Sequence, residues 1–288
     1  MRWAAAVVAS AIVLVGCGGS SSSSHADGSV EVVASFYPVA YAARRVGGPS
    51  VRVRDLTPSG VEPHDLEITT REVDRMEDAD LVLYVGGGFQ PAVEDVAKRW
   101  VDDPVDVRPA SVRTSDDPHF WLDPIAYRQS VDLVATALTA RGVDGVAARR
   151  DAFDAQLTAL DRDLRTTLSG CDRTTIVTSH AAFDHLARRY GLREEPITGL
   201  SPESEPDAGR MASIADLVTR TGTTTIFTEE LVSPRVADAL AREAGVTTAV
   251  LNPLEGLSAS ERRAGDDYVS VMRRNLATLA SALGCQQS

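Results

Sequence analysis

The chain contains none of the short motifs in which two histidines or two cysteines close in sequence bind a metal ion together. It has five histidines and three cysteines, and HExxH, CxxC and HxH segments are all absent. No internal repeat of about 20 to 50 residues is present, which argues against a solenoid or a propeller. A metal site in this protein must therefore be assembled from residues that are distant along the chain.

Basic residues are also scarce. Lys98 is the only lysine, and 29 Lys and Arg residues stand against 41 Asp and Glu residues, which gives a formal net charge of −12. Nucleic acids are bound through a basic face that neutralises phosphates. The charge balance therefore argues against a nucleic acid partner.

The first 16 residues are typical of a secretory signal peptide. Arg2 precedes an uncharged apolar run from Ala4 to Val15, which is too short to span a bilayer comfortably. The run ends in Leu14-Val15-Gly16-Cys17, which resembles a bacterial lipobox and predicts that Cys17 becomes the lipidated first residue. An ordinary signal peptide with an incidental cysteine is the alternative. Residues 17–29, nearly all Gly and Ser, predict a flexible tether.

Two further cysteines, Cys171 and Cys285, remain in the exported part. Exported thiols oxidise readily, so the pair predicts a disulfide that ties the C-terminus to its own domain. Two unpaired, buried thiols are the alternative.

Extended apolar segments alternate with helical patterns along the mature chain, and this alternation predicts parallel sheets covered by helices. The expected strands are 30–36, 51–56, 81–85, 174–179, 224–228 and 247–251, and the expected helices are 39–46, 70–79, 92–101, 183–190, 208–221, 234–244 and 266–283. About 255 folded residues suffice for two domains. We expect an N-terminal β/α lobe over 30–144, a linking helix over 145–170 and a C-terminal β/α lobe over 171–288.

The linking segment carries one apolar stripe with helical spacing, formed by Phe153, Leu157, Leu160, Leu164 and Leu168. A helix over Val146 to Leu168 would be roughly 35 Å long at ~1.5 Å per residue. We expect this helix to join both lobes as a rigid element and to limit the opening of the cleft between them.

Three of the five histidines lie where an extended segment or loop gives way to a helix, which is where α/β proteins place ligand-binding side chains. His64 follows the turn 58–60, His119 precedes an expected helix with Asp123 as N-cap, and His180 follows an apolar strand. Each histidine taken alone could be an incidental loop residue. The prediction of a metal site rests on the three histidines together. His25 lies in the tether, and His185 should face away from His180, so neither is assigned.

The chain resembles the substrate-binding lipoproteins of bacterial zinc and manganese ABC transporters, also called the cluster A-I or cluster 9 family. The resemblance covers essentially the whole mature chain. It is carried by the segments Glu62-Pro63-His64-Asp65-Leu66-Glu67, Asp117-Pro118-His119-Phe120-Trp121-Leu122-Asp123-Pro124, Ser179-His180-Ala181-Ala182-Phe183, Leu200-Ser201-Pro202-Glu203, Leu251-Asn252-Pro253-Leu254-Glu255-Gly256-Leu257 and 267–276.

The resemblance implies one metal ion in the cleft between two (β/α) lobes joined by a long rigid helix. It implies that His64 and His119 are ligands from the N-terminal lobe and that His180 is a ligand from the C-terminal lobe. The fourth ligand it implies is Glu255, with water or Glu229 as alternatives. Judged by the same resemblance, manganese-binding members of the family have a glutamate in place of His180 and an aspartate near the position of Asn252. This chain has neither carboxylate.

Three imidazoles suit Zn²⁺, whereas manganese prefers more oxygen ligands. The resemblance therefore implies a monomeric zinc-binding component of an ABC importer, anchored by Cys17 to the outer face of the cytoplasmic membrane and serving a permease and its ATPase. A manganese-type binding protein, an exported zinc hydrolase and a surface adhesin with a structural metal are the alternatives. Neutral imidazoles are needed for binding, so affinity should fall as pH drops through roughly 6.5.

Overall fold

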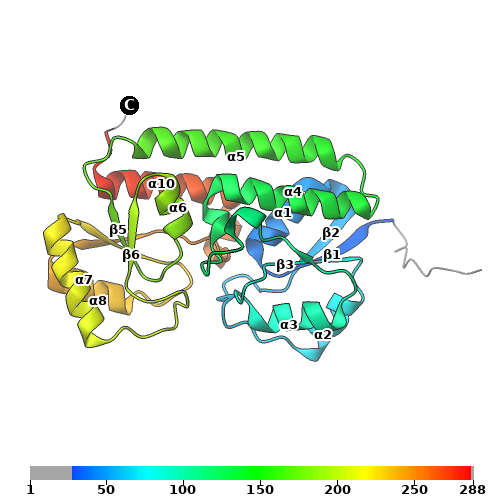
Figure 1. Ribbon diagram of the computed structural model, residues 1–288, viewed down its shortest axis with the longest axis horizontal. Helices are drawn as coiled ribbons and strands as arrows, with labels where there is room; N and C mark the ends of the chain where they lie inside the picture. The colour runs from blue at the N-terminus through cyan, green and yellow to red at the C-terminus, as the bar shows by residue number, and fades with distance from the viewer. Residues whose placement is uncertain (1–27, 287–288) are drawn as a thin grey trace, which may run out of the picture.

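The structure is a computed structural model of the 288-residue chain and describes residues 28–286. The predicted signal peptide, Cys17, His25 and most of the tether lie outside the described residues. Two four-stranded parallel sheets, with strand orders β2-β1-β3-β4 and β6-β5-β7-β8, form the two lobes (Figure 1). The predicted α/β architecture with two lobes is confirmed.

The N-terminal lobe is built around β1, which pairs with both β2 and β3. Its elements are β1 (Val30–Ala34), α1 (Tyr37–Gly47), β2 (Val51–Asp55), α2 (Thr70–Glu77), β3 (Leu81–Tyr84), α3 (Pro91–Trp100), β4 (Val105–Asp106) and α4 (Pro124–Ala140). Asp123 caps α4 by accepting a hydrogen bond from the backbone of Ile125, and Pro124 occupies its first turn, as the sequence predicts.

The C-terminal lobe repeats this plan around β5, which pairs with β6 and β7. Its elements are β5 (Thr175–Thr178), α6 (Asp184–Arg189), β6 (Arg193–Pro196), α7 (Ala208–Thr221), β7 (Thr225–Thr228), α8 (Arg235–Ala244), β8 (Thr247–Val250), α9 (Ala259–Ala264) and α10 (Tyr268–Leu283). In both lobes, parallel strands bring their carboxyl ends to one edge of the sheet, and the loops that follow can meet.

Helix α5 (Val146–Leu168) spans both lobes, as the sequence predicts (Figure 1). All five residues of its predicted apolar stripe are buried. The helix packs against α1 and α4 of the N-terminal lobe and against α10, which returns from the C-terminal lobe. It therefore acts as a common support on one side of both sheets.

Several short elements were not predicted, and others differ in length. β6 has the sequence Arg-Glu-Glu-Pro at the edge of its sheet and carries no apolar signature, and β4 has only two residues. α6 is shorter than predicted and ends at Arg189. α10 begins at Tyr268 because Asp267 caps it through the backbone of Ser270.

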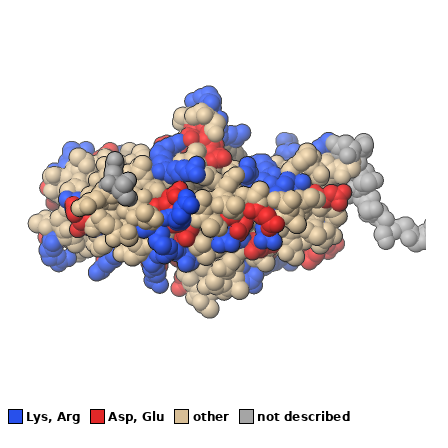
Figure 2. Space-filling view, turned by 90° about the horizontal axis from the view of Figure 1, so that it is seen from above, with Lys and Arg blue, Asp and Glu red and all other residues tan. Residues whose placement is uncertain are grey.

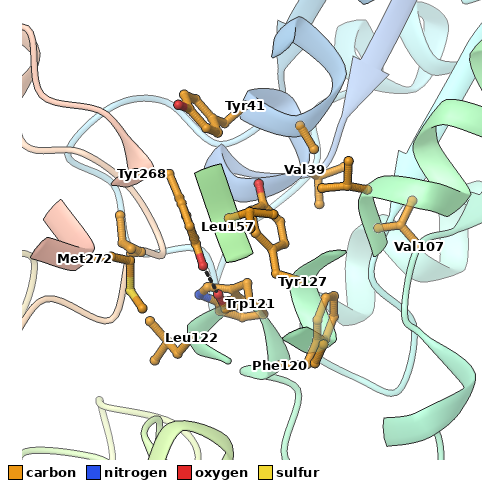
Figure 3. Packing of buried hydrophobic residues seen from close by; sticks show 14 of the residues in the cluster. Val39, Tyr41, Val107, Phe120, Trp121, Leu122, Tyr127, Leu157, Tyr268 and Met272 are labelled. Carbon is orange, nitrogen blue, oxygen red and sulfur yellow. Dashed lines mark hydrogen bonds between the residues drawn. The ribbon is translucent and has the colours of Figure 1, made fainter. Parts of the chain in front are cut away.

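One continuous apolar core runs through both lobes. At its centre the hydroxyl of Tyr268 donates a 2.6 Å hydrogen bond to the carbonyl oxygen of Trp121, and the ring of Tyr268 lies beside that of Tyr127 (Figure 3). Trp121 and Tyr127 belong to the N-terminal half of the chain, whereas Tyr268 begins α10. Separating the lobes would therefore expose large aromatic side chains to water, which is costly.

Cys171 and Cys285 are bonded to each other, which confirms the predicted disulfide. The bond joins the segment before β5 to the end of α10, where the backbone N–H of Arg173 also donates to Leu283 O at 3.0 Å. No helix within residues 28–286 is long and apolar enough to cross a membrane. On the face seen from above in Figure 2, acidic and basic side chains are mixed and form no broad region of one sign.

Candidate metal centre

His64 enters the site from the loop that follows β2. Its backbone N–H donates to Glu62 Oε1 at 3.0 Å, and buried Pro63 restricts the chain just before it. The imidazole ring meets the ring of Phe89 edge-on, with centroids 4.6 Å apart. Packing against Phe89 thus orients the imidazole ring of His64, and the carboxylate of Glu62 holds the backbone of His64.

His119 is fully buried at the end of the loop that leads to α4. Asp117 accepts hydrogen bonds from both the backbone N–H and the ring Nδ1 of His119, at 2.9 and 2.7 Å. These bonds assign the proton of the neutral ring to Nδ1. Nε2 is then left with a free lone pair directed into the site.

His180 follows β5 and is also fully buried. Glu229, which directly follows β7, accepts hydrogen bonds from the ring Nδ1 at 2.8 Å and from the backbone N–H at 3.2 Å. Glu194 on β6 holds the loop after His180, because its Oε1 accepts from the backbone N–H groups of Ala182 and Phe183 at 3.2 and 3.0 Å. His180 therefore has the same Nδ1-to-carboxylate arrangement as His119.

Glu255 lies in the loop between β8 and α9. Leu254 just before it has a φ of 57°, an uncommon conformation for a residue other than glycine. The side chain of Asn252 stabilises this turn by accepting from the backbone N–H of Leu254 at 2.7 Å. The strained turn directs the fully buried Glu255 carboxylate between the two lobes.

The four side chains His64, His119, His180 and Glu255 converge, with all four ligand atoms within 4.8 Å of one another. Glu255 Oε1 lies 3.3, 3.0 and 3.2 Å from the Nε2 atoms of His64, His119 and His180. His119 Nε2 lies 3.4 Å from the Nε2 atoms of both other histidines. Four ligands about 2.0 to 2.1 Å from a tetrahedral zinc are separated by roughly 3.3 Å. Five of the six separations in this cluster are close to that value, and the sixth, between Nε2 of His64 and Nε2 of His180, is within 4.8 Å.

The electrostatics of this cluster also favour a cation. With Nδ1 of His119 and His180 carrying the protons, two imidazole lone pairs and a carboxylate face one another in a buried space, and this arrangement favours a positive charge between them. Burial lowers the pKa of His119, but Asp117 and Glu255 outweigh it and raise that pKa to about 9. The pKa of His180 is likewise raised well above its usual value, because Glu229 and Glu255 outweigh its burial. Protons therefore occupy the metal-free site, and a metal ion must displace them.

The sequence did not identify the residues that orient the imidazoles. Asp65, Glu67, Asp123 and Ser179 are polar residues close in sequence to the three histidines, but Asp65 and Glu67 are exposed, Asp123 pairs with Arg189, and the hydroxyl of Ser179 donates to a backbone carbonyl. Asp117 and Glu229 perform this role instead. Asp117 could have been found from its position two residues before His119, whereas Glu229 approaches His180 only through the pairing of β5 with β7.

The remaining predictions concern residues near the cluster. His185 lies outside it, with Nε2 3.0 Å from the carbonyl oxygen of Asp117, in agreement with its being left unassigned. Glu229, considered as an alternative fourth ligand, contacts the Nδ1 side of His180 and lies behind that ring as seen from the cluster. Glu255 is the carboxylate that reaches all three Nε2 atoms.

The sequence and the fold are similar to those of known proteins. The model of the family described as "ZnuA: Zinc-uptake complex component A periplasmic" matches residues 32–282. Zinc-binding protein AdcA of Streptococcus pyogenes serotype M6 is 34% identical over 288 residues, which cover 88% of this chain and 56% of AdcA. This chain thus spans about half the length of that relative.

Other relatives are matched over their whole length. The high-affinity zinc uptake system protein ZnuA of Bacillus subtilis is 32% identical over 306 residues, covering 96% of each protein. The crystal structure of the Zn(II)-bound ZnuA-like domain of Streptococcus pneumoniae AdcA superposes with a TM-score of 0.78 at 32% identity, covering 89% of this chain and 99% of that domain.

Proposed function

This chain belongs to the ZnuA family, and from that premise we propose that it is the extracytoplasmic component of an ABC importer that captures Zn²⁺ and delivers it to the membrane permease. The observation that carries the proposal is the convergence of three imidazole Nε2 atoms and one carboxylate at separations that fit a tetrahedral zinc ion. The names and the zinc-bound structure of its relatives support the same cargo.

We assign His64, His119, His180 and Glu255 as the zinc ligands. The Nδ1 hydrogen bonds to Asp117 and Glu229 support this assignment, because a ligating histidine usually donates its other ring proton to an oxygen partner. Three nitrogens and one oxygen favour zinc over manganese, which prefers more oxygen ligands. Four protein ligands also leave no open position for a catalytic water, so we propose that the chain is not an enzyme.

The predicted lipidation of Cys17 and the tether over residues 17–29 support an anchored protein on the outer face of the cytoplasmic membrane. A Gly/Ser tether of the kind predicted from the sequence permits repeated docking to the permease and its ATPase while preventing loss of the protein by diffusion. We propose that it works there as a monomer with lobes over 30–144 and 171–288 joined by the segment 145–170.

Zinc release must occur without wide separation of the lobes. The core shared by both lobes, the rigid helix α5 and a bidentate pair between Asp123 and Arg189 all resist that movement. The ligands from the C-terminal half, His180 and Glu255, lie on loops and are the parts that can move locally. We propose that docking to the permease displaces one of these loops.

Native mass spectrometry of the chelator-treated protein in mixtures of Zn²⁺ and Mn²⁺ tests this function. We expect one tightly bound zinc per chain and its loss in Glu255→Gln, which keeps the shape of the side chain and removes its charge. Preferential retention of manganese would contradict the proposed cargo. Unchanged zinc retention in Glu255→Gln would contradict the assignment of the fourth ligand.

A further inference from the structure

The loop that carries Glu255 is held by side chains rather than by a neighbouring strand. Residues 252–258 connect β8 to α9, and in the described part of the chain no strand pairs with them. Instead, the side chain of Asn275 on α10 binds both backbone groups of Asn252. Its Oδ1 accepts from the N–H at 2.9 Å, and its Nδ2 donates to the carbonyl oxygen at 2.7 Å. An amide side chain offers the same donor and acceptor as a peptide group, so Asn275 takes the place of a strand partner.

Glu261 on α9 holds the other end of the same loop. Its Oε2 accepts from the backbone N–H and the hydroxyl of Ser258, at 2.9 and 3.0 Å. Its Oε1 accepts from Nδ2 of Asn252 at 2.9 Å and from Arg274 on α10 at 3.0 Å. The two ends of the loop are therefore tied to each other and to α10 through one network of hydrogen bonds.

The three central residues of this network, Asn252, Asn275 and Glu261, are buried. Every nitrogen and oxygen of their side chains has a hydrogen-bond partner, which offsets the cost of burying two amides and a carboxylate. The other buried residues of α10 are apolar or aromatic. Packing alone would favour an apolar side chain at position 275, so the amide there indicates a role for its hydrogen bonds.

The network holds in place the turn that directs Glu255 between the lobes. The φ of 57° at Leu254 costs free energy and persists only where the surrounding contacts impose it. Asn252 imposes it by accepting from the backbone N–H of Leu254, and Asn275 fixes Asn252. The Glu255 carboxylate has no anchor of its own, because Oε1 faces the three Nε2 atoms and Oε2 has no hydrogen-bond partner within residues 28–286. Its position therefore depends on the backbone of the loop.

We propose that Asn275 is a positioning residue for the zinc ligand Glu255, and that Asn275 and Glu261 together tie the loop 252–258 to α10. Helix α10 packs against α5, which spans both lobes (Figure 1). The loop is thereby attached to the rigid part of the molecule, and this attachment limits how fast Glu255 withdraws from zinc. The inference rests on the proposed function, because it takes Glu255 as a ligand.

Stopped-flow transfer of zinc from the full-length protein to a chelator tests the proposal. Asn275→Leu keeps the branched shape of the side chain and removes both hydrogen bonds to Asn252, so zinc should leave roughly tenfold faster or more. Glu261→Gln is the milder variant and is the one to use if Asn275→Leu does not fold. It replaces one acceptor oxygen by an amino group, and zinc should leave about fivefold faster because one hydrogen bond of the network is lost.

Tyr127→Phe is the matched control for a loss of stability. The buried hydroxyl of Tyr127 donates to the carbonyl oxygen of Pro38 at 2.6 Å, between α4 and α1, and neither helix carries a proposed zinc ligand. Tyr127→Phe and Asn275→Leu each remove a partner from buried backbone groups, so both should unfold at a lower urea concentration than the wild type. Only Asn275→Leu should release zinc faster.

Cobalt in place of zinc reports the geometry of the site. A tetrahedral Co²⁺ site absorbs visible light more strongly than a site with five or six ligands, because the geometry around the metal determines its electronic transitions. The visible absorption of cobalt-loaded Asn275→Leu should be weaker than that of the wild type, since water replaces the displaced carboxylate of Glu255. The spectrum of Tyr127→Phe should match that of the wild type.

A wild-type release rate and cobalt spectrum in Asn275→Leu or in Glu261→Gln would overturn the inference. An equal acceleration of zinc release in Tyr127→Phe would also overturn it. Glu255→Gln separates this failure from a failure of the proposed function. Loss of zinc in Glu255→Gln together with unchanged release in Asn275→Leu would overturn the positioning role alone. Retention of zinc by Glu255→Gln would overturn the ligand assignment on which both rest.

Discussion

Trp121 Nε1 donates a 2.8 Å hydrogen bond to the carbonyl oxygen of Pro253, so the residue two positions after His119 is joined to the residue two positions before Glu255. The indole ring also lies edge-on to the imidazole of His119, with centroids 5.2 Å apart. This single buried bond sets the spacing between a histidine loop of one lobe and the carboxylate loop of the other.

Trp121→Phe removes this hydrogen bond and keeps most of the aromatic surface. We expect a loss of roughly 1–3 kcal/mol in unfolding free energy, because the buried carbonyl of Pro253 loses its donor. Zinc should also dissociate faster, because the Glu255 loop is less constrained. Urea unfolding and stopped-flow transfer to a chelator measure the two effects. Trp100→Phe, at a position that is 62% exposed, should change neither.

His119→Ala should abolish retention of zinc in native mass spectrometry, because it removes a buried ligand and leaves a cavity beside Glu255. His185→Ala is the matched control, because this histidine lies on α6 outside the cluster and should cost at most a few-fold in affinity. Equal loss of zinc in the two variants would show that the cluster is not the binding site.

Glu229→Gln and Asp117→Asn should each weaken zinc binding by roughly 10- to 100-fold, because each removes the charge that orients a ligating imidazole and raises its basicity. Competition against a fluorescent zinc chelator measures this change. Glu230→Gln provides the comparison, since Glu230 is the exposed neighbour of Glu229. An affinity for zinc that is the same in Glu229→Gln as in the wild type would contradict the role assigned to that carboxylate.

Glu194 makes stability depend on pH. Burial raises its pKa from 4.5 to about 7, so between these values the folded protein binds more protons at Glu194 than the unfolded chain does. Its stabilising contribution is therefore complete below about pH 4.5 and is lost as the pH rises through 7. Between pH 5 and 8, the unfolding free energy of the metal-free wild type should fall by on the order of 2 kcal/mol relative to that of metal-free Glu194→Gln.

Urea unfolding of both metal-free proteins across this pH range measures the difference, in which the other titrating groups cancel. Glu195→Gln, a change on the same strand at a residue that pairs with Arg193, serves as the control. Parallel pH profiles for wild type and Glu194→Gln would refute the prediction.

Replacing both bonded cysteines by serine should lower the unfolding free energy by about 2–4 kcal/mol, because the bond closes a loop of 114 residues in the unfolded chain. The number of zinc ions bound should stay at one, since the bond lies at the outer end of α10, away from the space between the lobes (Figure 1). Thermal unfolding with and without reductant measures the effect. Reductant should lower the unfolding temperature of the wild type and leave that of the double variant unchanged.

Local sequence patterns are sufficient to predict the features that depend on neighbours along the chain. The four- and three-residue spacing of Phe153, Leu157 and Leu160 is sufficient to predict α5, because helical periodicity is local. The cap at Asp123 followed by Pro124 similarly predicts the start of α4. Three histidines at the ends of strands or loops indicated a site, and a family resemblance added Glu255.

The way in which these residues meet depends on long-range packing. Glu255 reaches His64 across 191 positions in sequence and His180 across 75, and no local pattern encodes such contacts. The selection of Asp117 and Glu229 over Asp65 and Asp123 depends on which carboxylates the packing of strands brings to each Nδ1. A cavity lined by Arg44, Asp55 and Arg262 likewise exists only because the two lobes pack together, so that residues from distant segments face the same space.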